Sequence, residues 1–223
     1  MMIFRHLFPA LFIPVLLLGI GCSRESLSTD TDRSTEIQEV VLEDGTYLLD
    51  ALSSSIVWNA KKRVGAHHTG TINAQQGAVV IEGGAVTGGR MEVDTRTIAD
   101  TDLTNEKDNK KLVGHLKSKD FFNVAVYPTA TFALEEARAV ALSADASHEV
   151  TGTMAIKGIE NEITFPAVFV MTDAGLEMTG VVTLDRTLWD VRYGSGKFFE
   201  NLGDELIEDE FTLTLNLIFT LEE

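Results

Sequence analysis

Histidines and a glycine-rich tetrapeptide are the residues of this chain that could do chemistry. His67 and His68 are neighbours, and neighbouring side chains of a strand point to opposite faces, so the two cannot easily share one metal ion. A rim or hydrogen-bonding role is favoured over metal ligation. Residues 194–197, Gly-Ser-Gly-Lys, have the ending of a phosphate-binding loop, but Phe198 follows where serine or threonine is needed. This segment is therefore not expected to bind a nucleotide.

The remaining candidates for catalysis are equally weak. His115, Ser118 and Asp120 lie close together, but such residues commonly cap helix ends. His148 falls in a small, polar stretch, residues 137–148, that is expected to be a hairpin loop. The sequence contains neither a His-x-His nor a Glu-x-x-His spacing for a metal, and no Gly-x-Ser-x-Gly nucleophile motif. We therefore predict a protein that is not an enzyme and that holds no metal ion or cofactor.

The N-terminal residues have the pattern of a targeting segment. A basic start at Arg5 precedes an apolar run over residues 7–20, which is shorter than the ~20 residues that a spanning helix needs. The run ends at Cys22, the one cysteine, in a sequence that resembles a bacterial lipobox. We expect residues 1–21 to be a lipoprotein signal peptide, Cys22 to carry the lipid anchor, and polar residues 22–44 to be a flexible tether. The alternative is ordinary cleavage that leaves a free thiol.

The overall charge argues against two classes of function. The chain has 18 Lys and Arg against 34 Asp and Glu, a formal charge of −16. Neutralisation of phosphates requires a basic face, so a general nucleic-acid binder is not expected. Attachment to anionic lipid by charge alone is also not expected.

Alternating apolar residues indicate strands through most of residues 45–223. Ile56, Trp58 and Ala60 share one face, and a run of alternating apolar residues extends from Phe211 to Leu221. Residues 75–77, Gln-Gln-Gly, predict a turn between two short strands. About eight strands with short connections and no βαβ pattern predict an all-β fold, an eight-stranded antiparallel barrel with one short helix.

Residues 104–119 are the expected helix, because the periodicity changes there from two to about 3.6. Leu112, Val113 and Leu116 lie at helical spacing, and five lysines occupy much of the remainder. The lysines are expected either to form a solvated face paired with the acidic residues 204–210, or to form a headgroup site at the mouth of a cavity.

Large apolar side chains at inward positions are the candidate walls of such a cavity. On composition alone, a filled core is favoured over a cavity that holds an elongated ligand. The candidate wall residues are Trp58, Phe132, Phe165, Phe169, Phe211 and Phe219, and the candidate mouth residues are Phe121, Phe122 and Trp189.

Four segments resemble the YceI-like family of lipocalin-like polyisoprenoid-binding proteins. They are residues 47–58, the His-x-Gly motif at 68–70, residues 115–132 with the pair Phe121 and Phe122, and residues 152–159 with 185–189. The resemblance covers residues 45–223. It implies a barrel with an apolar tunnel that holds an isoprenoid chain, and it shifts the preference from a filled core to a ligand cavity.

The resemblance also implies a biological role. We expect a carrier or sequestering protein for a polyisoprenoid or an isoprenoid quinone in the bacterial cell envelope. The protein would be anchored through Cys22, on the outer membrane facing the periplasm, and a homodimer is a further possible assembly. The alternative is a structural or stress-related envelope module with a filled barrel.

Overall fold

The computed structural model describes residues 42–65 and 67–223. The predicted signal peptide, Cys22 and most of the predicted tether lie outside the described residues. None of the described helices combines the length and the apolar character that a membrane-spanning helix needs. The strands are β1 (Gly45–Leu49), β2 (Ser55–Lys61), β3 (His67–Glu82), β4 (Ala85–Asp100), β5 (Thr129–Ala139), β6 (His148–Ile156), β7 (Ile159–Thr172), β8 (Gly175–Asp185) and β9 (Glu210–Leu221).

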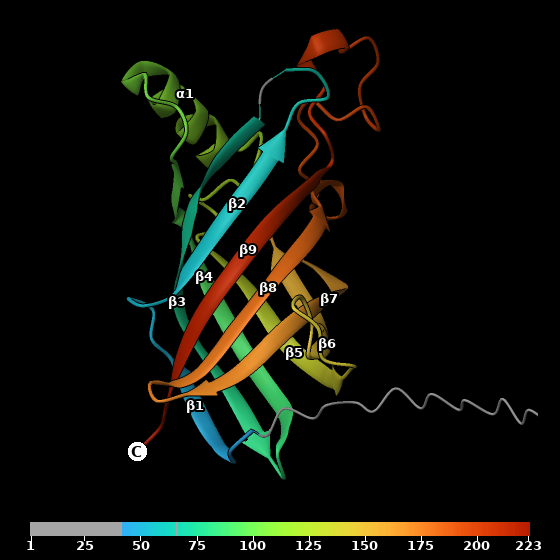
Figure 1. The fold of residues 1–223 in the computed structure, drawn as a ribbon. Coiled ribbons are helices and arrows are strands. Elements are labelled where there is room, and N and C mark those ends of the chain that lie inside the picture. The colour runs from blue at the N-terminus through green and yellow to red at the C-terminus, as the bar shows by residue number, and fades with distance from the viewer. Residues whose placement is uncertain (1–41, 66) are drawn as a thin grey trace, which may run out of the picture. The chain divides into compact units, whose positions relative to one another are not determined.

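These strands form a closed antiparallel barrel (Figure 1). The order is β1-β3-β2-β9-β8-β7-β6-β5-β4, and pairing between β3 and β4 closes the sheet. β1 and β2 each pair with both β3 and β9, β1 near one end of the barrel and β2 nearer the other. Because β1 and β2 share one position around the barrel, nine segments make eight strands. The predicted eight-stranded antiparallel barrel is confirmed.

The predicted helix is also confirmed, as α1 (Glu106–Lys117). Asn105 caps its N-terminus, because the Asn105 side chain accepts hydrogen bonds from the backbone N–H groups of Lys107 and Asp108. Glu106 and Asp108 occupy the first turn and Lys117 the last, an arrangement that complements the helix dipole. α1 lies against β4, near the end of the barrel where β2 pairs (Figure 1).

Two local expectations are wrong. Residues 75–77 form no turn, because β3 continues through them with a register shift between Ala74 and Gln76. A β-bulge accommodates the extra residue, Gln75. Gly77 lets the backbone of β3 approach that of β4 closely, since a Cβ there would lie 2.9 Å from the Arg90 carbonyl oxygen. His148 is not in a loop but begins β6, and its side chain is buried.

Apolar side chains pack the interior of the barrel around β1. Tyr47, Phe169, Leu176, Leu217 and Phe219 are all buried there, and they belong to one continuous cluster. Two short 3₁₀ helices, η1 (Arg186–Trp189) and η2 (Gly203–Glu205), lie in the long connection between β8 and β9. That connection and α1 lie towards the end of the barrel opposite to β1 (Figure 1).

Candidate functional site

An apolar cavity occupies the half of the barrel that α1 covers. Its volume is about 130 Å³. Alternation along the strands explains the lining, because every second side chain of a barrel strand faces inward. The strand residues of the wall are Ile56, Trp58, Ala60, Ile72, Val93, Thr95, Ile98, Ala130, Met154, Ile156, Phe211 and Leu213.

Leu116 of α1 and the two phenylalanines that follow it also line the cavity. The segment after α1 turns back on the helix, since the Phe122 N–H donates to the Leu116 carbonyl oxygen at 3.1 Å. Phe121 is buried, and its ring lies edge-on to His115 with 4.9 Å between the ring centroids. The turn therefore directs both aromatic rings towards the cavity, and α1 with its C-terminal turn forms a cover.

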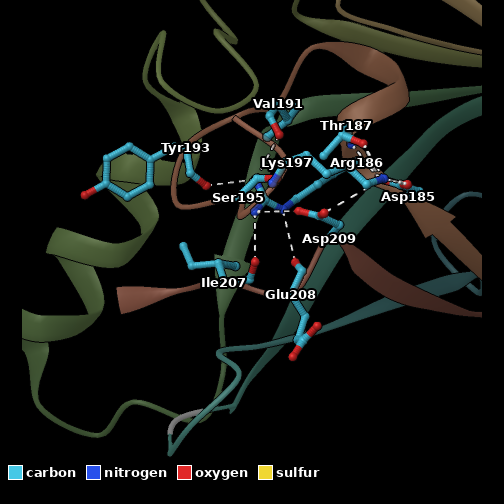
Figure 2. A network of polar contacts seen from close by, with 10 residues as sticks. All are labelled: Asp185, Arg186, Thr187, Val191, Tyr193, Ser195, Lys197, Ile207, Glu208 and Asp209. Carbon is cyan, nitrogen blue, oxygen red and sulfur yellow. Dashed lines mark hydrogen bonds and ion pairs between the residues drawn. The ribbon is translucent and has the colours of Figure 1, made fainter. Parts of the chain in front are cut away.

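Arg186 is one of two charged residues in the lining, and its guanidinium is fully engaged by protein acceptors (Figure 2). Its Nε donates to the Glu208 carbonyl oxygen at 3.1 Å, and Nη1 donates to the carbonyl oxygens of Val191 and Tyr193 at 2.8 and 2.9 Å. Nη2 donates to the Ile207 carbonyl oxygen at 3.1 Å and to Asp209 Oδ1 at 3.3 Å. These five bonds equal the five N–H donors of an arginine.

The role of Arg186 is consequently structural. Its bonds hold both ends of the connection between β8 and β9 against each other, and no donor is left to bind a ligand. Burial lowers the pKa of Arg186, while the carboxylates of Asp209 and Asp185 oppose that effect. Nearby, Lys197 Nζ donates to Asp185 Oδ2 at 2.5 Å, which ties the same connection to the end of β8 (Figure 2).

Comparison with known proteins places this architecture in a family. A model of the YceI-like domain matches residues 47–219. The chain belongs to the YceI-like family. No curated protein sequence matches it significantly.

Solved structures share the fold of this YceI-like chain at low sequence identity. BcnA of Burkholderia cenocepacia is 21% identical and has a TM-score of 0.59, over 76% of this chain and 98% of BcnA. A polyisoprenoid-binding domain from Saccharophagus degradans, implicated in plant cell wall breakdown, is 12% identical with a TM-score of 0.57. That match covers 81% of this chain and all of the other domain. Such likenesses establish the fold.

The predicted site residues of the YceI-like chain separate into three places. Trp58, Phe121, Phe122 and Phe211 line the cavity. The others that were expected in the wall lie outside the lining, in or against the packed core, namely Phe132, Phe165, Phe169 and Phe219. Trp189, expected at the mouth, is fully buried in η1, and its Nε1–H donates to the Met154 carbonyl oxygen at 3.1 Å.

Sequence reasoning missed most of the smaller residues of the wall. Ile72, Val93, Ala130 and Met154 line the cavity although they were not named as candidates. Alternation identifies such residues as inward-facing, but it does not say how far along the barrel axis each one lies. Because the candidates were chosen for their aromatic side chains, they included residues of the packed core as well as residues of the cavity wall.

The lysines of α1 lie mostly on a solvated face, as the first of the two expectations states, because Lys107, Lys110 and Lys111 are exposed. In the part of the chain that the structure describes, no lysine lines the cavity, whose charged residues are Arg186 and Glu208. Lys110 pairs with Glu106 inside the helix at 2.5 Å. The acidic residues 204–210 pair with other cations, because Glu205 binds Lys62 at 2.7 Å and Asp209 binds Arg186. Among the described residues, no direct ion pair joins the lysines of α1 to residues 204–210, although the hydrogen bond from Lys62 and, to a smaller extent, the charge of Lys111 lower the pKa of Glu205.

Proposed function

We propose that this YceI-like protein binds the chain of an apolar lipid, a polyisoprenoid or an isoprenoid quinone, in the cavity beneath α1, and that it acts as a carrier or sequestering protein. The almost wholly apolar lining of that cavity carries the proposal. Burial of a hydrocarbon chain yields roughly 25 cal/mol per Å² of apolar surface removed from water, so a lining of this kind favours a chain over a polar ligand.

The polar groups of the lining support recognition of the chain rather than of a charged headgroup. Arg186 has no free donor, and Thr95 Oγ1 already donates to the Tyr127 carbonyl oxygen at 2.8 Å. Almost no polar atom is exposed in the lining, so a charged headgroup would find no partner there. A neutral prenol or quinone therefore suits the lining better than a prenyl phosphate.

A binding role also fits better than catalysis. The lining contains Thr95, Arg186 and Glu208 but no histidine, serine or cysteine that could serve as a nucleophile or its base. The polyisoprenoid-binding domain with the same fold supports the class of ligand. We further propose attachment to the bacterial envelope through an acylated Cys22, on the outer membrane facing the periplasm.

Native mass spectrometry of the gently purified protein tests this function. We expect one bound prenyl lipid per barrel, or uptake of one neutral prenyl lipid after delipidation, with weaker uptake of the corresponding phosphate. A protein that carries no lipid and takes up none would support the alternative of a structural module. A clear preference for the phosphate would overturn the inference about the headgroup.

A further inference from the structure

A cluster of one histidine and two carboxylates lies beside the cavity, where β3 pairs with the end of β4. His68 belongs to β3, Asp100 is the last residue of β4, and Asp102 follows two residues later. His68 Nδ1 is 3.1 Å from Asp102 Oδ2 and 3.9 Å from Asp100 Oδ2. One ligand atom from each residue lies within 4.8 Å of the other two.

Asp100 is the unusual member, because its buried carboxylate is only half satisfied. The residue is 8% exposed, and its Oδ1 accepts hydrogen bonds from the Leu103 N–H at 2.9 Å and from Asn109 Nδ2 at 3.0 Å. Among the described residues, Asp100 Oδ2 is the one buried side-chain oxygen or nitrogen without a hydrogen-bond partner. Leaving a buried carboxylate oxygen unpaired costs free energy, so such an atom indicates a missing partner.

Two kinds of partner could satisfy that oxygen, a proton or a cation. Burial raises the pKa of Asp100, which would favour a proton shared with the Asp102 carboxylate. The position of His68 favours a cation, because its Nδ1 lies within hydrogen-bond distance of Asp102 Oδ2 and within 4 Å of Asp100 Oδ2, which brings three potential ligand atoms together. Asp102 is already held by the Thr69 N–H, which donates to its Oδ1 at 2.8 Å and leaves Oδ2 directed at His68.

We infer that His68 Nδ1, Asp100 Oδ2 and Asp102 Oδ2 form a binding site for one divalent cation of the zinc class. Bonds of about 2.0–2.2 Å would leave tetrahedral donor atoms roughly 3.3–3.5 Å apart, and the distances of 3.1 and 3.9 Å lie on either side of that range. An imidazole with two carboxylates suits zinc better than magnesium or calcium, which prefer oxygen alone. The side chains of His68 and Asp102 are 25% and 29% exposed, so water can reach a fourth position.

The site would join the cover of the cavity to its wall. Asn109 of α1 bonds to both the Asp100 carbonyl oxygen and Oδ1, at 3.0 Å each. Next to Asp100, the Ala99 carbonyl oxygen accepts the indole N–H of Trp58, which lines the cavity. A bound cation would therefore stiffen the region where α1, β3 and β4 meet. The sequence does not reveal this arrangement, because Asp100 and Asp102 lie more than thirty residues after His68 and reach it only through the pairing of β3 with β4.

Zinc titration of the tag-free full chain, in mild detergent and carrying Cys22→Ser so that no thiol competes, tests the inference. With a chromophoric chelator as competitor, we expect saturable binding of one zinc ion per chain at pH 7. Asp102→Asn and His68→Ala should each weaken binding at least tenfold. His67→Ala, which removes the neighbouring imidazole on the opposite face of β3, should change the affinity less than twofold.

Thermal unfolding gives a second readout and covers variants that fold poorly. Zinc should raise the melting temperature of the parent chain and of His67→Ala, but not that of Asp102→Asn. The absence of saturable binding would overturn the site and leave the shared proton as the partner of Asp100. Loss of binding in His67→Ala together with retention in Asp102→Asn would overturn it as well. Neither outcome bears on lipid binding, which native mass spectrometry measures separately.

Discussion

At the scale of single residues, Arg186 shows how a charge can lie beside an apolar cavity without serving its ligand. The residue is 5% exposed and bonds to four backbone carbonyl oxygens and one carboxylate. A buried guanidinium is tolerated only when its donors are paired, and here the pairing also fixes residues 186–209. The arginine therefore belongs to the framework of the site.

Arg186→Lys should consequently destabilise the fold although it keeps the charge. A lysine has three donors in place of a planar fork of five, so at least two buried acceptors lose their partners. We expect a loss of about 2–4 kcal/mol in the free energy of unfolding, measured with urea. Arg192→Lys is the matched control, since Arg192 is 57% exposed at the pair with Asp190 and should cost less than about 1 kcal/mol. Equal effects of the two substitutions would contradict the anchoring role.

His148 gives the barrel a pH dependence of known sign. The buried imidazole contacts the Ser147 hydroxyl at 2.9 Å and packs edge-on against Phe169, and burial lowers its pKa below 6.5. The unfolded chain therefore binds a proton more readily than the folded one once the pH falls below about 6.5. Stability from neutral His148 is complete above that pH and is lost as the pH falls towards the lower folded pKa.

Urea unfolding at pH 7.5 and 5.5 measures this effect as a difference between two chains. The parent should lose more stability than His148→Gln, by at most about 1.4 kcal/mol per pH unit below 6.5. The comparison removes the contributions of other groups, including the buried Asp100, whose raised pKa acts in the opposite direction. If His148→Gln showed the same pH dependence as the parent, neutral burial of His148 would be refuted.

At the scale of elements, the periodicity of apolar residues predicted the strands and the helix whose formation depends on local sequence. The alternation in β2 and β9 and the helical spacing of Leu112 and Leu116 both follow from nearby residues. The continuous β3 could not be predicted, because its bulge at Gln75 is stabilised by pairing with β4 rather than by local preference. His148 was misplaced for the same reason, since its burial depends on β7 and not on its polar neighbours.

Gly70 in β3 illustrates how one element constrains another. A Cβ at this position would lie 1.9 Å from the Ala99 carbonyl oxygen and 2.5 Å from Cζ2 of Trp58. The His68-Thr69-Gly70 motif thus has a physical reason, because glycine lets the Trp58 indole lie flat across β3 and reach Ala99. The Cβ of an alanine at this position would have to displace the Ala99 backbone or the Trp58 ring.

Gly70→Ala should therefore lower stability strongly, by about 3 kcal/mol or more. Gly88→Ala is the matched control on β4, because nothing lies within 4 Å of a Cβ there. That substitution should change the free energy of unfolding by less than about 1 kcal/mol, and it could raise it by reducing the entropy of the unfolded chain. Differential scanning calorimetry distinguishes the two, and similar melting temperatures would contradict the close approach at Gly70.

At the scale of the whole molecule, the barrel is filled in one half and hollow in the other. Phenylalanines occupy inward positions in both halves, so Phe219 in the core and Phe211 in the cavity belong to the same strand and the same face. The sequence predicted which side chains face inward but not where along the barrel axis each one lies. That position depends on how β1 and β2 share one strand position and on which end of the barrel α1 covers. The preference between filled core and cavity therefore required the three-dimensional arrangement.

Ala130 and Ala133 on β5 provide the most direct test of the claim that the hollow half holds a lipid chain. Ala130 lines the cavity, whereas Ala133 is exposed on the outside of the same strand. Ala130→Leu would place three additional carbon atoms inside the cavity, and Ala133→Leu would add the same atoms outside the barrel. The measurement is native mass spectrometry of both delipidated variants after titration with one neutral prenyl lipid. We predict at least tenfold weaker binding for Ala130→Leu and unchanged binding for Ala133→Leu, and equal binding by the two folded variants would contradict lipid binding in this cavity.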